Sequence, residues 1–412
     1  MTPEDLLAGS SINAARLGTY DSEKWWRPAD QAALPAISLA GADETVAAMD
    51  ELLAGHCMPG DRLITRYPMA TAVRDGLGAA RITFDHVAVD GPHEPLERNV
   101  SRDLVAGFTV SPYAVLPDTA RLTDLLPDND VVAKVNSKTW SNTLAQELEL
   151  PGTGTVVRSV AELSAAVSRF PSAIVKDPYG VSGRGALVVE SPGVLRGIER
   201  ALTKQGKRIE LLVQEKYTVE RDFSAHVLIS RDGTWQHLGI QVMTNRGLRH
   251  MGSSPATPEF TEFLADKGYL SIIDSVAERL VKAGYFGPVG VDSMLLRDGT
   301  LIPVLEVNAR QSLGLLSLVL DTRFPVAAHL SQVELTIPPG SGISSIAQAL
   351  GEILYTGGER EGVLVLNGSK LAAPGGRVYF ALMSPHPDVL RQRVLDAVAA
   401  AGMIVRGVAH AA

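Results

Sequence analysis

The sequence predicts a mixed α/β (α+β) protein built from three parts, and three observations lead to that prediction. Helix-like and strand-like stretches alternate in the first part of the chain, which is typical of an open α/β domain. Near the middle, a glycine-rich loop joins two runs rich in β-branched residues. From about residue 340, two amphipathic stretches enclose two apolar ones, which predicts a small α+β unit. We therefore expect domains over residues 1–130, 131–338 and 339–412.

Composition and charge narrow the class of protein. The 412 residues are 45% apolar and 20% charged, as in soluble globular proteins of two or three domains. The net charge of −8 argues against a nucleic-acid partner, because phosphate binding needs a clustered basic surface. Cys57 is the only cysteine, which excludes an intramolecular disulfide and fits a reducing compartment. The N-terminal stretch lacks a signal-peptide core, and no run approaches about 20 apolar residues, so we expect a cytoplasmic protein with no membrane partner.

The elements follow from periodicity and from turn residues. In the first part, residues 43–54 have helical spacing with Asp43 as N-cap, residues 61–67 predict a strand, and the aspartate- and proline-rich stretch 116–130 predicts a boundary. In the second part we expect helices over 134–152, 162–169 and 270–283, with strands over 173–176, 186–190, 211–215, 222–230, 235–243, 289–296 and 301–307. The third part predicts helices over 343–355 and 388–400, with strands over 363–366 and 378–383.

The loop in IVKDPYGVSGRGALVV, residues 174–189, limits what it can bind. Lys176 precedes the glycines and a strand follows them, whereas a Walker phosphate loop or a dinucleotide fingerprint opens a helix. A nucleophile elbow fails because Arg184 stands where its last glycine belongs. A strand–loop–strand hairpin remains, whose glycines allow exposed backbone N–H groups to bind phosphate. An ordinary mobile hairpin fits the loop alone equally well.

Two later stretches carry polar residues that suit a nucleotide and a metal ion. Glu215 ends an apolar strand, and Asp222 follows seven residues later. Such a strand end can offer backbone groups to an adenine edge and a carboxylate to a ribose. Glu306 and Asn308 are two residues apart and share a strand face, and Asp292 lies on the expected partner strand. Two carboxylates and an amide oxygen suit Mg²⁺. Taken singly, each residue could equally be a salt-bridged, turn-forming or exposed strand residue.

The order of these motifs resembles the ATP-grasp superfamily, over roughly residues 134–321. The segment IVKDPYGVSGRG is similar to its phosphate-covering loop, VQEKY to its adenine-binding hinge, notably as in biotin carboxylase, and LEVNAR to its metal-binding strand. The resemblance implies ATP and Mg²⁺ as cofactors. It implies that ATP is bound by Lys138, Lys176, the loop residues Gly183, Arg184 and Gly185, the hinge residues Glu215, Lys216, Tyr217 and Thr218, and Asp222 at the ribose, while Asp292, Glu306 and Asn308 hold the metal.

One position departs from part of the superfamily. D-Alanine–D-alanine ligases carry an arginine two residues before the first metal aspartate, where this sequence has Gly290. Arg310 is placed like the arginine that follows the metal asparagine in biotin carboxylase, so we expect it to hold a substrate carboxylate or an oxyanion. A structural pairing of Arg310 with a neighbouring acid is the alternative. The layout of the parts before and after the central one resembles pheganomycin-type peptide ligases, which would imply natural-product biosynthesis.

The resemblance implies an ATP-dependent ligase with Lys176 and Arg310 as catalytic residues. A small-molecule acid would attack the γ-phosphate to give an acyl phosphate, and an amine or peptide would then displace phosphate. Such chemistry chiefly requires positioning and charge neutralisation. A carboxylase-type enzyme, a kinase and a nucleotide-binding regulator without turnover stay open as alternatives. Arg246 and Arg249, in a stretch expected to be a loop over 244–258, are either carboxylate ligands or solvated charges. The sequence names neither substrate, and a homodimer is compatible with it.

Overall fold

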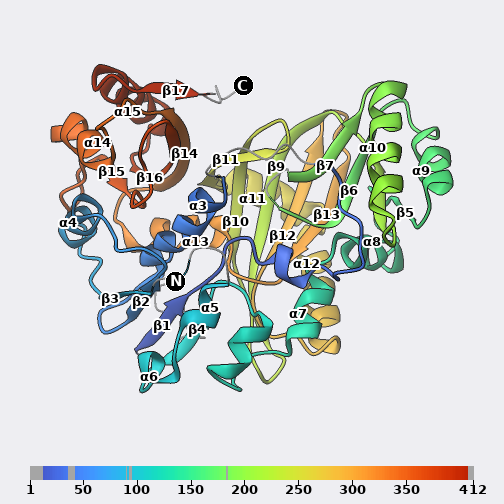
Figure 1. Ribbon diagram of the computed structural model, residues 1–412, viewed down its shortest axis with the longest axis horizontal. Coiled ribbons are helices and arrows are strands. Elements are labelled where there is room, and N and C mark those ends of the chain that lie inside the picture. The colour runs from blue at the N-terminus through green and yellow to red at the C-terminus, as the bar shows by residue number, and fades with distance from the viewer. Residues whose placement is uncertain (1–12, 36–41, 90, 92–94, 182–183, 407–412) are drawn as a thin grey trace.

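The computed structural model describes residues 13–35, 42–89, 91, 95–181 and 184–406, which form three β-sheets with helices around them (Figure 1). The first sheet is parallel, in the order β3-β2-β1-β4, and belongs to the N-terminal part. Its strands are β1 (Ala14–Leu17), β2 (Arg62–Thr65), β3 (Asp85–Ala88) and β4 (Thr109–Pro112). Between them lie α2 (Glu23–Trp26), α3 (Ala42–Ala47), the 3-10 helix η1 (Ala48–His56), α4 (Thr71–Ala79), α5 (Leu96–Asn99) and α6 (Arg102–Val105). This alternation confirms the predicted α/β class.

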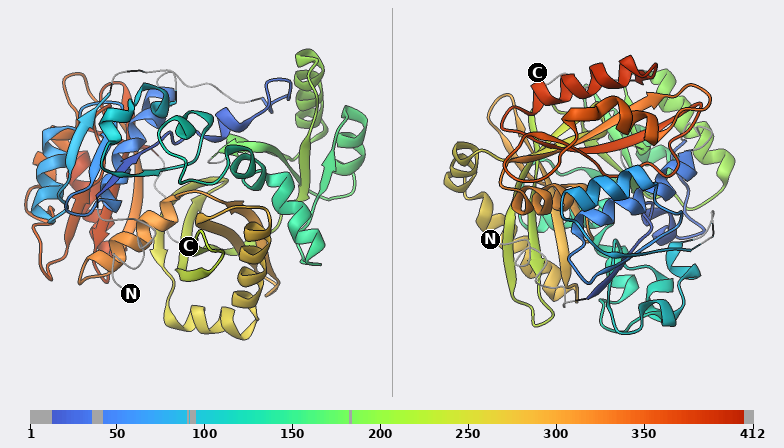
Figure 2. Two further views of the ribbon diagram at one scale, coloured as in Figure 1. Left: turned by 90° about the horizontal axis from the view of Figure 1, so that it is seen from below. Right: turned by 90° about the vertical axis from the view of Figure 1, so that its left-hand side faces the viewer.

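The second sheet carries the glycine-rich hairpin and is antiparallel, in the order β5-β8-β6-β7. Its strands are β5 (Thr155–Val157), β6 (Ala173–Val181), β7 (Arg184–Val189) and β8 (Leu211–Glu215), and it packs on α9 (Val160–Val167) and α10 (Pro192–Gln205). The N-terminal segment ties this sheet to the first part, because Leu34 joins its apolar core and Arg27 pairs with the buried Asp177 at 2.6 Å. In Figure 1 and the left view of Figure 2, this sheet lies at the opposite end of the molecule from the C-terminal part.

The third sheet has nine strands in the order β13-β12-β9-β10-β11-β14-β16-β15, with β17 also paired to β14. The strands are β9 (Val219–Ile229), β10 (Trp235–Arg246), β11 (Arg249–Pro255), β12 (Gly287–Leu296), β13 (Leu301–Asn308), β14 (Ala328–Thr336), β15 (Gly362–Val365), β16 (Gly375–Met383) and β17 (Ile404–Arg406). Helices α11 (Pro258–Asp266), α12 (Tyr269–Lys282), α13 (Leu313–Arg323), α14 (Ile343–Leu350) and α15 (Pro387–Ala400) accompany it. One apolar core joins the N-terminal part to this sheet and its C-terminal strands, and it includes Leu52, Phe223 and Phe380.

Strand β14 connects the second and third parts of the chain. It pairs with β11 on one side and with β16 on the other, so the sheet runs without a break past the boundary expected at residue 338. The helices α14 and α15 pack together, and α15 lies against β15 and β16, as the α+β prediction for this part requires. The division into three domains stays a prediction.

Four expected elements differ from the structure. The helix expected over 343–355 ends at Leu350, and only a short 3-10 helix (Gly351–Ile353) follows it. The helix expected over 134–152 is two helices, α7 (Asn129–Val135) and α8 (Lys138–Glu147), because the Asn136 side chain donates to the carbonyl oxygens of Val132 and Ala309 and ends the first one. The segment 244–258, expected to be a loop, continues β10 and forms β11. The helix expected over 43–54 starts as α3, in which Asp43 lies inside the first turn, and continues as the 3-10 helix η1 to His56.

Among the described residues, no helix combines the length and the apolar character that crossing a membrane would need.

Candidate functional site

A cleft of about 610 Å³ lies where the three parts meet. Its lining includes Tyr20 from the N-terminal part, Lys176 from the hairpin sheet, Glu306 from the nine-stranded sheet and Arg377 from the C-terminal part. Most of the residues singled out from the sequence line this one cleft, although they are spread over more than 170 positions. The fold therefore assembles the predicted motifs into a single site.

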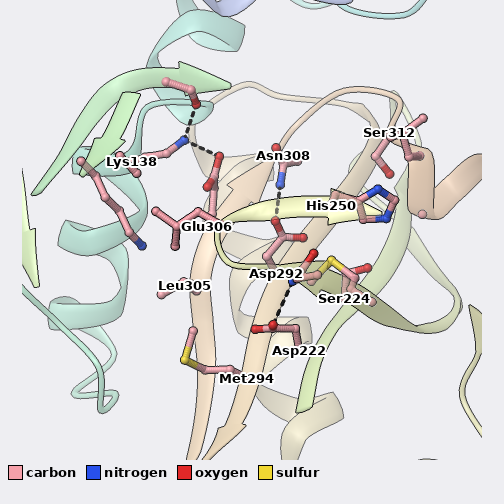
Figure 3. A pocket seen from close by; sticks show the side chains of 18 of the residues that line it. Lys138, Asp222, Ser224, His250, Asp292, Met294, Leu305, Glu306, Asn308 and Ser312 are labelled. Carbon is pink, nitrogen blue, oxygen red and sulfur yellow. Dashed lines mark hydrogen bonds and ion pairs between the residues drawn. The ribbon is translucent and has the colours of Figure 1, made fainter. Parts of the chain in front are cut away.

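Strands β12 and β13 place the three expected metal ligands side by side on the cleft floor (Figure 3). Asp292 is directly opposite Glu306 in the strand register, and the Asn308 amide donates to Asp292 Oδ2 at 3.1 Å. Burial, together with the neighbouring Glu306 carboxylate, raises the pKa of the Asp292 carboxyl to about 7. Two close carboxylates in a buried place are stabilised by a cation. Together with an amide oxygen they form a hard donor set, which fits Mg²⁺.

Two lysines face these acids from the other side of the cleft. Lys138 is the first residue of α8, and its Nζ lies 2.6 Å from Glu306 Oε1 and 2.8 Å from the Gly180 carbonyl oxygen. Burial alone would raise the pKa of Glu306, but the Lys138 ammonium, followed by Lys176 and Arg310, holds it below its usual value. Burial lowers the pKa of Lys176 to about 8, although Glu306 counteracts that shift. Charges within this group of two ammonium groups and two carboxylates thus shift the pKa values of Lys176, Asp292 and Glu306.

The end of the cleft near β8 is apolar and fits a planar base. Ile174, Val188, Met294 and Leu305 line it, next to Glu215, Lys216 and Tyr217 at the end of β8. Asp222 also lines the cleft, and its Oδ2 accepts a hydrogen bond of 2.8 Å from the Asn245 amide.

Three expected ATP contacts are not placed in the cleft by the described structure. Thr218 lies outside the lining, although its neighbours Lys216 and Tyr217 are within it. Gly183 falls outside the described residues. Arg184 pairs with Val181 through its backbone, and its side chain is likewise outside the description. Gly185 lines the cleft with a positive φ of 95°.

Arg310 lies beyond the end of β13 with its guanidinium almost fully engaged. Its NH2 and Nε donate to Glu23 Oε1 at 2.6 and 3.0 Å, NH1 donates to the Tyr113 hydroxyl at 2.8 Å, and NH2 also donates to Asn308 Oδ1 at 3.0 Å. Both partners of the Arg310–Glu23 ion pair are buried, at 10% and 6% side-chain exposure. The alternative pairing with an acid is therefore present, and Arg310 also lines the cleft beside the metal ligands.

Sequence analysis missed the residues of the cleft that come from distant parts of the chain. Tyr20 and Tyr113 of the N-terminal part and Arg377 of β16 line the cleft and were not singled out. Glu23, which pairs with Arg310, was not singled out either. No local motif marks these residues, because each reaches its place only through the packing of separate parts. Arg249 pairs with Glu334 at 2.5 Å, and Arg246 is exposed at the tip of the β10–β11 hairpin.

No protein-family model matches the sequence. A [butirosin acyl-carrier protein]–L-glutamate ligase of Niallia circulans is 25% identical over 237 residues, which are 52% of this chain and 55% of that protein. The chain thus matches about half the length of this relative.

Solved structures match over most of the chain. The biotin carboxylase domain of Hydrogenobacter thermophilus 2-oxoglutarate carboxylase, solved with MgADP, ADP and bicarbonate, superposes with a TM-score of 0.54, 15% identity and 88% coverage of each chain. N5-carboxyaminoimidazole ribonucleotide synthetase of Thermus thermophilus gives a TM-score of 0.54 at 15% identity, covering 86% of this chain and 95% of that one. The corresponding synthase of Aspergillus clavatus, solved with ADP and 5-aminoimidazole ribonucleotide, gives 0.53 at 12% identity, with 82% and 97% coverage. The likeness to these enzymes shows that the chain has the ATP-grasp fold, as its motifs predicted.

Proposed function

We propose that the protein is an ATP-dependent carboxylate–amine ligase, which joins an acid to an amine or peptide and releases ADP and phosphate. The observation that carries the proposal is the placement of two lysines opposite the Asp292–Glu306–Asn308 group in one cleft, where Lys138 pairs with Glu306 at 2.6 Å and Lys176 lines the same cleft. Cations and hard oxygen ligands at that spacing suit a triphosphate with its metal ion. The glutamate ligase relative supports the ligation, and the nucleotide complexes of the structural neighbours support ATP as its co-substrate.

Each part of the site has a role in this proposal. The apolar end near Met294 and Leu305 takes the adenine, and Asp222 meets the ribose. Lys138 and Lys176 hold the phosphates, and Asp292, Glu306 and Asn308 would hold Mg²⁺, which would neutralise charge on the phosphates. The hairpin of β6 and β7 covers them and keeps water away from the acyl phosphate.

The reaction proceeds in two steps. A carboxylate oxygen of the acid attacks the γ-phosphorus, the bond to the β-phosphate oxygen breaks, and ADP leaves. The amine nitrogen then attacks the acyl carbon, and phosphate leaves as the amide bond forms and the nitrogen loses a proton. Arg310, in this proposal, faces the carboxylate and then the oxyanion of the second step. Glu23 orients its guanidinium through the two short hydrogen bonds.

The activity is tested by incubating the protein with ATP, Mg²⁺ and a library of acids and amines, and by detecting products with mass spectrometry. A ligase releases ADP and phosphate only when both substrates are present. A kinase releases no free phosphate, a carboxylase requires bicarbonate, and a regulator releases nothing. Turnover that needs no amine would overturn the proposal.

Variants assign that turnover to the site. We expect Glu306→Gln and Asn308→Ala to reduce it at least 100-fold, because each removes a hard ligand. Glu220→Gln, which changes an exposed acid on β9 of the same sheet, serves as the control and should retain turnover.

A further inference from the structure

The cleft extends beyond Arg310 into an end that the nucleotide and the metal do not require. Tyr20, Val46 and Met49 of the N-terminal part line this far end together with His250 and Ser253 of β11 and Arg377 of β16. Two aromatic residues connect it to Arg310. The Tyr113 hydroxyl accepts a hydrogen bond from Arg310, and the Tyr113 ring stacks on Tyr20 with a centroid distance of 4.0 Å and an interplanar angle of 19°. A ligand that spans the cleft therefore passes from the metal site to the C-terminal part of the chain.

The far end holds more positive than negative charge. Arg377 and Arg249 share one carboxylate, that of Glu334, at 3.4 and 2.5 Å. Within the described ranges, no other acid forms an ion pair with either arginine, so this group of three has a net charge of +1. Arg377 lines the cleft and Arg249 does not. The Arg377 side chain is only 17% exposed, and a half-compensated charge at such a depth is stabilised by an anion.

Hydrogen-bonding groups accompany this charge. His250 Nε2 lies 2.8 Å from the Ser253 hydroxyl, whereas its Nδ1 is buried and has no hydrogen-bond partner in the described part of the chain. Figure 3 shows His250 in the cleft, on the side away from Lys138. Arg377 NH1 faces the sulfur of Met49 at 4.0 Å, which is a poor acceptor for a guanidinium. The Arg377 guanidinium and the unpaired His250 Nδ1 lie beside the apolar side chains of Val46 and Met49. This combination suits an organic ligand that carries a carboxylate.

We propose that Arg377 binds a second carboxylate, one that the enzyme does not activate, on one of its two substrates. The inference rests on the proposed ligase function and adds the substrate class: at least one substrate is an amino acid, a peptide with a free C-terminus or a diacid. The carboxylate comes either from the amine substrate, as its α-carboxylate, or from the acid substrate, as its second acid group. Both sources present the same planar anion to the guanidinium fork.

The test compares wild-type protein with substrates that differ only in that carboxylate. For an acid–amine pair that gives product, the kcat/KM for the amine substrate is measured as the free amino acid and as its carboxamide. The kcat/KM for the acid substrate is measured as the diacid and as its mono-amide. We expect one of the two replacements to lower kcat/KM about 100-fold, and the one that does so identifies the source.

Variants connect this preference to Arg377. Arg377→Gln should lower kcat/KM for the carboxylate substrate about 100-fold, mainly through KM, and should leave the carboxamide and the KM for ATP within a few-fold of wild type. Arg377→Lys keeps the charge and should recover part of the preference. Arg391→Gln serves as the control, because it removes an arginine of the same part of the chain that pairs with Asp388 and lies outside the lining. Thermal denaturation of each variant shows whether it is folded.

Two outcomes separate this inference from the proposed function. Product formation in which neither carboxamide replacement matters, or in which Arg377→Gln keeps the wild-type preference, overturns the role of Arg377 and leaves the ligase intact. A wild-type protein that forms no product, and whose melting temperature no amino acid or diacid raises in the presence of Mg²⁺ and a non-hydrolysable ATP analogue, overturns both. If Arg377→Gln does not fold, two other measurements decide whether Arg377 binds a second carboxylate: the carboxamide comparison on wild-type protein and the substrate preference of Arg377→Lys.

Discussion

Lys138 and Glu306 form an ion pair of 2.6 Å across the cleft, although they are separated by 168 positions in the chain. The same ammonium donates to the carbonyl oxygen of Gly180 in the glycine-rich hairpin. One lysine thus connects α8, the hairpin of the second sheet and the acidic strand of the third sheet. It supplies positive charge beside a carboxylate that the proposed function assigns to Mg²⁺.

The first prediction concerns the stability of this pair. Lys138→Met should lower the free energy of unfolding by about 2 kcal/mol, because it leaves a buried carboxylate with Lys176 as its main remaining cation. The double variant Lys138→Met/Glu306→Gln should recover most of that loss, since the uncompensated charge is gone. Urea denaturation in the absence of nucleotide measures both. Lys204→Met, on the exposed side of α10, is the control. Additive effects of the two substitutions would contradict the coupling.

The second prediction separates the two roles of Arg310. Lysine keeps the charge of Arg310 but loses the planar fork that reaches Glu23, Tyr113 and Asn308 together. If the guanidinium also faces the substrate, Arg310→Lys should lower turnover about 100-fold. The affinity for ATP should change little, because the adenine and phosphate contacts are made by other residues. Turnover and nucleotide affinity are measured on the same preparation. A less stable protein with normal turnover would make Arg310 a structural clamp only.

Much of the site was predictable because its chemistry is local. Strand alternation alone places Glu306 and Asn308 on one face, and the hairpin of β12 and β13 brings Asp292 near them, although a register shift between Asp292 and Met294 sets it directly opposite Glu306. The loop sequence predicted the β6–β7 hairpin for the same reason. These relationships involve neighbours in a strand or in a hairpin, so residue type and spacing determine them.

The remainder depends on contacts between distant segments. The helix expected over 134–152 breaks at Asn136 because its amide reaches the Ala309 carbonyl, 173 positions away. Glu23 meets Arg310 across 287 positions, and Arg377 reaches the cleft only because β14 joins the C-terminal strands to the main sheet. No propensity or period in the sequence encodes such pairings. The roles of the individual site residues and the three-domain division likewise stay predictions.

The third prediction uses two glycines with opposite environments. Gly185 has a φ of 95°, and a Cβ added there would lie 2.7 Å from the Gly180 Cα. Gly185→Ala should therefore lower the free energy of unfolding by about 2 kcal/mol and weaken nucleotide binding by distorting the hairpin. Gly197 lies inside α10 with open space where its Cβ would be, so Gly197→Ala should raise stability by up to about 1 kcal/mol. Urea denaturation shows whether each substitution raises or lowers the free energy of unfolding. A stabilised Gly185→Ala protein would refute the close packing of the hairpin.

The last prediction concerns the pH dependence of stability at Glu51, which joins η1 to the C-terminal part. Glu51 Oε2 accepts hydrogen bonds from the backbone N–H groups of Gly368 at 2.7 Å and Ser369 at 3.4 Å. Burial raises the pKa of this carboxyl from 4.5 to about 7, and the hydrogen bonds counteract only part of that shift. Between these pH values the folded protein holds a proton that the unfolded chain releases. The Glu51 contribution to the free energy of unfolding therefore falls as pH rises through this window.

The size of this effect follows from about 1.4 kcal/mol per pKa unit, which gives about 3 kcal/mol over the whole shift. Glu51→Gln keeps an oxygen acceptor for Gly368 and cannot ionise. Relative to wild type, its free energy of unfolding should rise from no difference near pH 4.5 to an advantage of about 3 kcal/mol near pH 8. Urea denaturation at several pH values measures the difference, which cancels the titration of other groups. For Glu352→Gln, at an exposed position, the free energy of unfolding should change with pH in the same way as that of wild type. If Glu51→Gln also follows wild type, the Glu51 carboxyl is ionised in the folded protein and the effect of burial is refuted.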